Sequence, residues 1–122
     1  MTELQDRDLI LHILPRKDWE KARRQGEYRA ASLESEGFIH YSRPDQILGV
    51  ANHYFSGVED LVLLWIDPGK MASELRLERS GDQLFPHGYG SLNLEAVVGE
   101  VEISSDPDGI FRKFLRVDGR HI

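Results

Sequence analysis

Six consecutive apolar residues in the middle of the chain limit the folds that this sequence can adopt. The run covers 61–66 and reads Leu-Val-Leu-Leu-Trp-Ile, so that neither the odd nor the even positions contain a polar side chain. A strand with one face in water alternates apolar and polar side chains, whereas a strand covered on both faces does not. The sequence therefore predicts a central buried strand, and the run is far too short to span a bilayer.

A strand and a helix are expected before this run. The apolar stretch over 9–14, closed by Pro15, is typical of a buried strand. Asp18 is a suitable N-cap for a short basic helix, because its carboxylate can accept from the N–H groups of the first turn. In that helix we expect Trp19 to point inward, the arginines to point to solvent and Gly26 to end the helix.

A second strand and helix follow. Residues 32–37 are polar and turn-like, and residues 38–42 alternate so that His40 and Ser42 share one face of a strand. Ser42 also suits the N-cap of the next helix. That helix has an apolar stripe that predicts packing on a sheet, formed by Ile47, Leu48, Ala51, Tyr54 and Phe55.

The second half of the chain predicts two more strands. Residues 75–79 alternate leucine with charged side chains, and residues 97–103 indicate a long final strand with its glutamates outward. Between them, residues 85–90 contain one proline and two glycines, which predicts a loop. Because helices and strands are mixed without strict alternation, we expect the α+β class.

The composition indicates one domain and excludes several kinds of function. The chain has 122 residues, of which 40% are apolar and 30% charged, which suits a single core over 1–122. A net charge of −6 gives no reason to expect nucleic acid or an anionic membrane as a partner. The absence of cysteine excludes thiolate catalysis, and the polar first residues, unlike a signal peptide, predict a cytoplasmic protein.

Three of the histidines are candidates for a functional site. His12 lies in the first apolar strand, and His40 lies in a strand that ends near a helix N-terminus, where anionic groups bind well. His87 stands between a proline and a glycine in the expected loop. His53 falls off the apolar stripe of its helix and is expected in solvent. We predict that His12, His40 and His87 converge in one cleft.

A carboxylate and a metal site are the other chemical possibilities. Arg76 and Glu78 share one face of the strand over 75–79, where Glu78 is either paired with Arg76 or directed at a substrate. The sequence contains no phosphate-binding loop, dinucleotide glycine motif, zinc-protease motif or serine-hydrolase motif. Three histidines suit a metal ion in principle, but their wide spacing in sequence gives a metal little support.

Several blocks of sequence together resemble one protein family. They are ILHIL at 10–14, EGFIHYS at 36–42, LVLLWID at 61–67 and FPHGYGSLN at 85–93. On these blocks the chain resembles the domain-of-unknown-function 952 (DUF952) family over about residues 9–111. The resemblance implies the ADP-ribosyltransferase fold, in which a split β-sheet with short flanking helices grips NAD in its gap.

The same resemblance implies which residues bind NAD. His12 would contact the ribose on the adenosine side. The nicotinamide half would be held by His40, with Tyr41 and Ser42 beside it, and Tyr89 would also contact the nucleotide. The expected partner is therefore a small-molecule nucleotide.

The candidate catalytic residues are His40 and Glu78, which the resemblance implies, and His87, which has no clear counterpart in the better-known members of the ADP-ribosyltransferase superfamily. Glu78 would hydrogen-bond the ribose 2′-hydroxyl and stabilise the positive charge that develops as the bond to nicotinamide breaks. His40 would fix the geometry, and His87 would act as acid or base on the acceptor. Two alternatives stay open: a non-catalytic module that binds a nucleotide or another small ligand, and a metal-assisted acid–base enzyme that uses the three histidines.

Overall fold

The apolar run forms the middle strand of a three-stranded antiparallel sheet in the computed structural model, which describes residues 8–114. This strand, β4 (Leu61–Ile66), pairs with β1 (Ile10–Pro15) on one side and with β8 (Val97–Ile103) on the other. All six side chains of β4 are buried. The predicted central strand is thus confirmed, as are the strands on either side of it.

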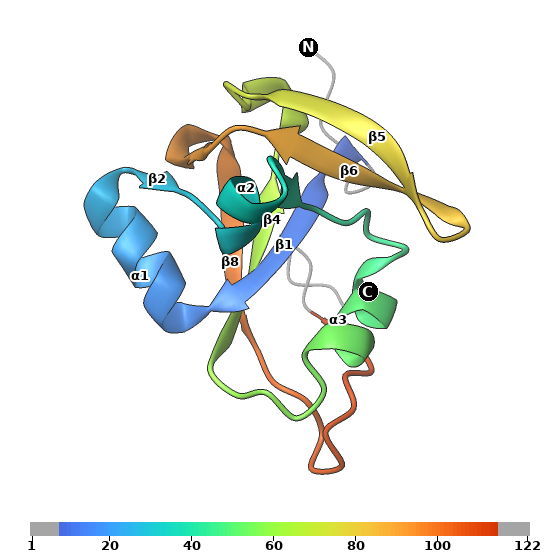
Figure 1. Ribbon diagram of the computed structural model, residues 1–122. Coiled ribbons are helices and arrows are strands. Elements are labelled where there is room, and N and C mark those ends of the chain that lie inside the picture. The colour runs from blue at the N-terminus through green and yellow to red at the C-terminus, as the bar shows by residue number, and fades with distance from the viewer. Residues whose placement is uncertain (1–7, 115–122) are drawn as a thin grey trace.

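A second three-stranded antiparallel sheet crosses near one end of the first (Figure 1). Its strands lie in the order β3 (Ile39–His40), β6 (Gln83–Tyr89) and β5 (Glu74–Ser80). The two sheets meet at Leu11 and Ser42, which exchange backbone hydrogen bonds of 2.8 and 2.9 Å. A short ladder of β2 (Glu27–Tyr28) and β7 (Leu92–Asn93) completes the described α+β domain.

The first two helices differ in their bounds from the sequence-based expectation. The helix α1 (Arg16–Gln25) begins directly after Pro15, and no side chain caps it, so Asp18 is not the N-cap. It ends as predicted at Gly26, where φ is 85°. The stretch predicted as a turn contains a short helix, α2 (Ala31–Ser35).

The third helix, α3 (Ile47–Tyr54), begins later than predicted. Ser42 does not cap it, because the Ser42 backbone is paired with Leu11 at the junction of the sheets. Ile47 and Ala51 are buried as expected, but Tyr54, in the last turn, is 70% exposed, so this part of the predicted stripe is wrong.

The proline-containing segment over 85–90 is largely strand rather than loop. Pro86 lies within β6, and its carbonyl accepts a hydrogen bond from the Tyr41 N–H at 3.0 Å. The N–H and C=O of one strand residue point to the same side, so the missing proline N–H faces the place where β3 has ended. The ladder between β5 and β6 therefore stays intact, which the local sequence pattern did not reveal.

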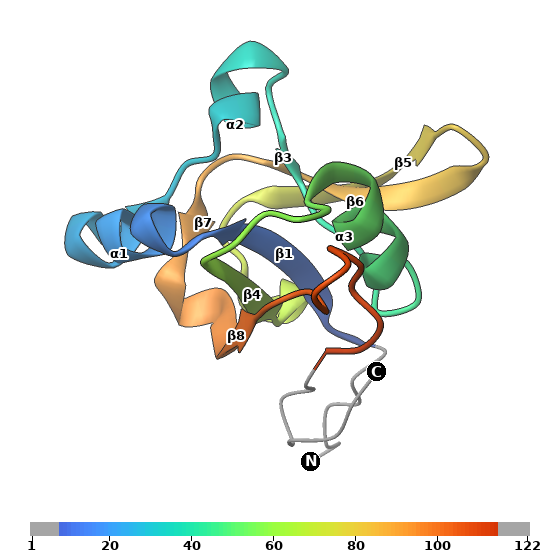
Figure 2. The same cartoon turned by 90° about the horizontal axis from the view of Figure 1, so that it is seen from below.

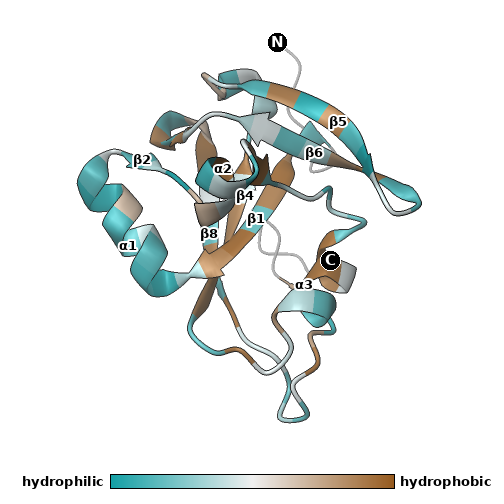
Figure 3. Ribbon diagram, viewed as in Figure 1, coloured by the Kyte–Doolittle hydropathy of each residue, from teal (hydrophilic) through white to brown (hydrophobic). Residues whose placement is uncertain are grey.

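The central sheet separates two apolar cores. Alternate residues of β4 enter opposite cores, with Val62, Leu64 and Ile66 in one and Leu61, Leu63 and Trp65 in the other. The first core is closed by α1 and the second by α3, which lie on opposite sides of the sheet in Figures 1 and 2. Figure 3 shows the corresponding hydrophobic colouring of β1 and β4.

Two sequence-based expectations concern the surface and the membrane. Glu100 and Glu102 lie exposed on β8, as predicted. No helix within residues 8–114 is long and apolar enough to cross a membrane. The amino-terminal residues that led to the expected cytoplasmic location lie outside the described residues, apart from Asp8.

Candidate functional site

The three candidate histidines line one pocket of about 440 Å³. It lies at the junction of the two sheets and is also lined by Tyr41 and Ser42, and by residues of α3. Antiparallel pairing places His40 directly opposite His87, with their ring centroids 5.2 Å apart. The predicted convergence of His12, His40 and His87 is confirmed, although their sequence separations are large.

His87 has the most unusual surroundings in this pocket. Its side chain is buried, and its Nδ1 lies 2.9 Å from Oε1 of Glu78. An ionised carboxylate only accepts hydrogen bonds, so Nδ1 donates to Glu78, and Nε2 is the acceptor whenever the ring carries a single proton. Nε2 is buried and makes no hydrogen bond to the described part of the chain. Phe38 stacks on the ring with a centroid distance of 4.1 Å, which fixes its plane.

Glu78 is held by two donors, His87 and Tyr89. The Tyr89 hydroxyl donates to the same Oε1 that accepts from His87. The hydrogen bond from Tyr89 has the largest effect on the pKa of Glu78, and it and the bond from His87 both lower that pKa. The hydrogen bond to Glu78 in turn raises the pKa of Tyr89. Neither Glu78 nor Tyr89 is among the residues that line the pocket. Glu78 therefore reaches the pocket only through His87.

His12 is engaged on both ring nitrogens. Its Nδ1 donates to the carbonyl of His40 at 2.7 Å, and Tyr28 donates its hydroxyl to Nε2 at 2.8 Å. Burial lowers the pKa of His12 to about 4, so the ring is neutral near pH 7. His12 thus ties β1 to β2 and β3, and neither nitrogen is left to bind a ribose or a metal.

The low pKa of His12 makes a prediction about stability. An unfolded histidine titrates near 6.5, so between about pH 4 and 6.5 the unfolded chain binds more protons than the folded one. We expect His12 to contribute about 3 kcal/mol above pH 6.5 and to lose this contribution as the pH falls toward 4. Urea unfolding at several pH values measures this contribution to the free energy of unfolding. His12→Gln should flatten the pH dependence between about pH 4 and 6.5, whereas exposed His53→Gln should keep the wild-type slope.

Tyr41 supplies a second buried polar atom without a partner. Its side chain is 1% exposed, and its hydroxyl makes no hydrogen bond to residues 8–114. The ring lies against Gly88, where an added Cβ would be 2.6 Å from Cε2 of Tyr41. Glycine at position 88 therefore lets the tyrosine ring cover β6 beside His87.

Two residues of the site were missed by sequence reasoning. Glu36 lines the pocket, and its Oε2 lies 2.9 Å from Nε2 of exposed His40. Phe38 stacks on His87 and lies edge-on to His40. The spacing of four residues between Glu36 and His40, with Phe38 on the same strand face as His40, was the available signal.

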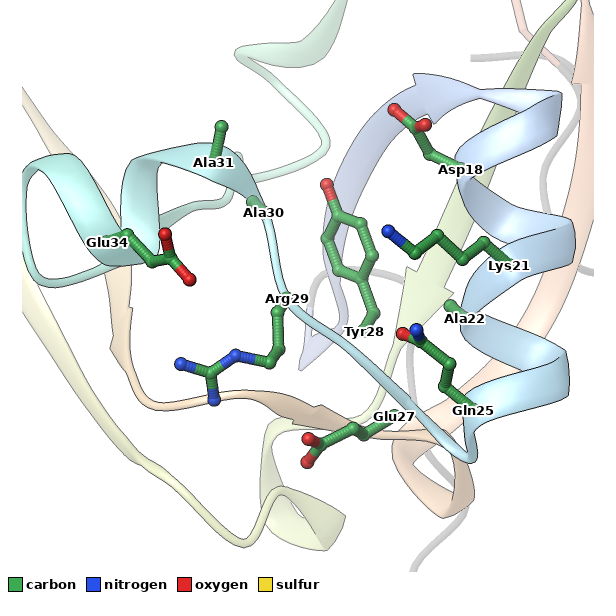
Figure 4. A pocket seen from close by; sticks show the side chains of 10 residues that line it. All are labelled: Asp18, Lys21, Ala22, Gln25, Glu27, Tyr28, Arg29, Ala30, Ala31 and Glu34. Carbon is green, nitrogen blue, oxygen red and sulfur yellow. The ribbon is translucent and has the colours of Figure 1, made fainter.

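A second pocket, of about 430 Å³, lies between α1 and the chain that leads into α2 (Figure 4). Tyr28 lines it, while the Tyr28 hydroxyl contacts His12 of the first pocket. Its charged side chains are mixed in sign, with Lys21 and Arg29 against Asp18, Glu27 and Glu34. Over residues 8–114, no group of three or more His, Asp or Glu side chains could hold a metal ion.

Comparisons with known proteins identify the family. The crystal structure of protein CC0527 from Caulobacter crescentus has 36% sequence identity, covers 84% of this chain and 91% of that one, and superposes with a TM-score of 0.78. The solution NMR structure of the same protein gives 35% identity, 84% and 90% coverage, and a TM-score of 0.75. No curated protein matches. The model of a family described as protein of unknown function (DUF952) matches residues 13–100, and the chain belongs to this family.

Proposed function

We propose that the three-histidine pocket binds the nicotinamide–ribose half of NAD. In this proposal His87 transfers a proton during cleavage of the bond that joins nicotinamide to the ribose. The observation that carries the proposal is the buried Nε2 of His87, which has no described partner, on a ring that Glu78 and Phe38 hold in place. A carboxylate that fixes an imidazole leaves the opposite nitrogen free to act as a base.

The size and chemistry of the pocket support this ligand. Its volume of about 440 Å³ lies within the usual range for small-ligand sites. Aromatic and aliphatic side chains line one part, and the polar lining residues include Glu36, His40, Tyr41, Ser42, Ser80 and His87. None of the described lining residues is lysine or arginine, and Glu36 is acidic, which favours a cationic nicotinamide ring over a pyrophosphate. The likeness to the ADP-ribosyltransferase fold, drawn from sequence blocks, also supports NAD.

The residues of the site have separate roles in the proposed reaction. NAD, when bound, supplies a glycosidic bond with a good leaving group. His87 accepts a proton at Nε2 from the attacking group, and Glu78 stabilises the resulting imidazolium. The Tyr41 hydroxyl donates to a polar ligand atom, and His40, paired with Glu36, orients the ligand from the exposed side. His12 is a positioning residue, because its nitrogens hold Tyr28 and His40.

Ligand-induced stabilisation tests the binding part of this proposal. At 100 times the dissociation constant, NAD should raise the unfolding free energy by about 2.7 kcal/mol, which thermal unfolding detects. We expect His87→Gln to weaken binding by about tenfold, the usual cost of losing one ligand hydrogen bond, and His53→Gln to leave binding unchanged. ADP-ribose, which lacks the nicotinamide ring, should bind more weakly than NAD.

Released nicotinamide, measured in the same samples, distinguishes an enzyme from a binding module. Release that depends on His87 supports the reaction. Stabilisation by NAD without any release would show that the pocket serves binding alone. If neither NAD nor ADP-ribose stabilises the protein, the nucleotide proposal is wrong.

A further inference from the structure

The outer strand of the second sheet has one unpaired side in the described chain. β5 pairs with β6 and with no other described strand. The β5–β6 hairpin projects beyond the body of the molecule in Figure 2. Leu77, at the middle of β5, is 59% exposed, and Leu84 on β6 is 41% exposed. Such an edge with apolar side chains is a template for another strand.

The pairing with β6 determines to which side the backbone N–H and C=O groups of each β5 residue point. Leu77 is paired with Pro86, whose carbonyl faces β3 rather than β5. In an antiparallel ladder, facing residues either exchange both backbone hydrogen bonds or exchange none. Leu77 and Pro86 exchange none, so the N–H and C=O of Leu77 point away from β6. The same holds for Leu75 and Arg79, two positions away on either side.

The sequence of β5 is self-complementary about Leu77. The strand reads Glu-Leu-Arg-Leu-Glu-Arg-Ser over 74–80, and Figure 3 shows alternating hydropathy colours along it. When a second copy is turned by a two-fold axis through Leu77, Leu77 faces Leu77 of the other chain, and Leu75 faces Arg79. Arg76 of each chain then faces Glu78 of the other, in the closely spaced pair position where cross-strand charges interact best.

Both charged side chains have atoms left for such a contact. Arg76 binds Glu74 through Nε and Nη2, its guanidinium lies 4.5 Å from the centroid of the Tyr89 ring, and its side chain is 52% exposed. Both hydrogen bonds to Glu78 end on Oε1, and the side chain is 37% exposed. One edge strand of the first sheet, β8, offers no equivalent pairing, because it contains Glu100 and Glu102 and no basic residue.

We propose that two copies of this chain associate by antiparallel pairing of their β5 strands about a two-fold axis at Leu77. The backbone groups of Leu77 exchange hydrogen bonds across the axis, and two Arg76–Glu78 pairs flank them. The pairing does not depend on the proposed NAD chemistry. A single strand pair buries little surface, so the dimer forms reversibly and at high chain concentration.

Sedimentation equilibrium over a range of chain concentrations tests the dimer. We expect the average mass to rise from monomer toward dimer for the wild type. Leu77→Lys should raise the dimer dissociation constant at least about tenfold, because it places two like charges on the axis. Ile110→Lys changes another exposed apolar residue, away from β5, and should behave as wild type.

A charge exchange tests the register. Arg76→Glu and Glu78→Arg, each alone, place like charges opposite one another and should remain monomeric. Mixed in equal amounts, the two variants face each other with opposite charges and should form a heterodimer. Circular dichroism confirms folding of each variant. If Glu78→Arg does not fold, the two single variants Leu77→Lys and Arg76→Glu test the pairing, and both should stay monomeric. A wild type that stays monomeric at millimolar concentration, or dimers unaffected by Leu77→Lys, would overturn the proposal.

Discussion

Replacement of Glu78 by glutamine is expected to slow nicotinamide release by about 10²–10³-fold, within the usual range for loss of general acid–base catalysis. The amide keeps the shape of the side chain but removes the charge that stabilises a protonated His87. Both hydrogen bonds to Glu78 end on Oε1, a position that the glutamine amide oxygen can occupy, so both acceptor contacts are kept. Affinity for NAD should change little, because Glu78 does not line the pocket.

A neighbouring carboxylate provides the control for this experiment. Glu74 lies on the same face of β5 and is paired with Arg76, away from His87. Glu74→Gln should therefore retain wild-type turnover. Equal loss of turnover in the Glu74 and Glu78 variants would mean that the charge of the strand matters rather than the orientation of His87. An unchanged rate in Glu78→Gln would remove Glu78 from the proposed mechanism.

Trp19→Ala is expected to lower the free energy of unfolding by about 3–5 kcal/mol, the usual cost of removing a large buried aromatic side chain. Trp19 is 5% exposed and packs from α1 into the core cluster that contains Leu64 and Ile66 of β4. Its indole N–H also donates to the Glu100 carboxylate on β8. Loss of the ring therefore removes both the packing and a link between helix and sheet.

Two further variants separate these contributions in urea unfolding experiments. Trp19→Phe keeps much of the apolar surface and loses the hydrogen bond, so we expect a smaller cost, about 1–2 kcal/mol. Arg24→Ala changes an exposed residue of the same helix and should cost less than about 0.5 kcal/mol. A cost well below 1 kcal/mol for Trp19→Ala would contradict the burial of the indole ring.

The sequence alone determined the framework of the fold and the family of the chain. The unbroken apolar run predicted β4, because only a strand covered on both faces avoids polar positions. Gly26 correctly predicted the end of α1, because its left-handed backbone favours glycine. These signals are local: each depends on a few adjacent residues and on the general cost of exposing apolar groups or straining the backbone.

Three of the expectations that were wrong depended on distant partners. Asp18 and Ser42 have the side chains of N-caps, but the chain path set by the sheets started the helices elsewhere. Pro86 lies in a strand because its missing N–H falls where β3 ends, which depends on a register formed across more than 40 residues. A local pattern contains no information about such a register.

The tertiary structure also decided how the histidines divide their tasks. In sequence, His12, His40 and His87 were all candidates for ligand contact. The fold gives both nitrogens of His12 to Tyr28 and His40, and it leaves the buried Nε2 of His87 without a described partner. The sequence shows which donor and acceptor groups are present, but contacts between residues distant in sequence decide which of these groups are already hydrogen-bonded. Only the fold therefore shows which atoms remain free for a ligand.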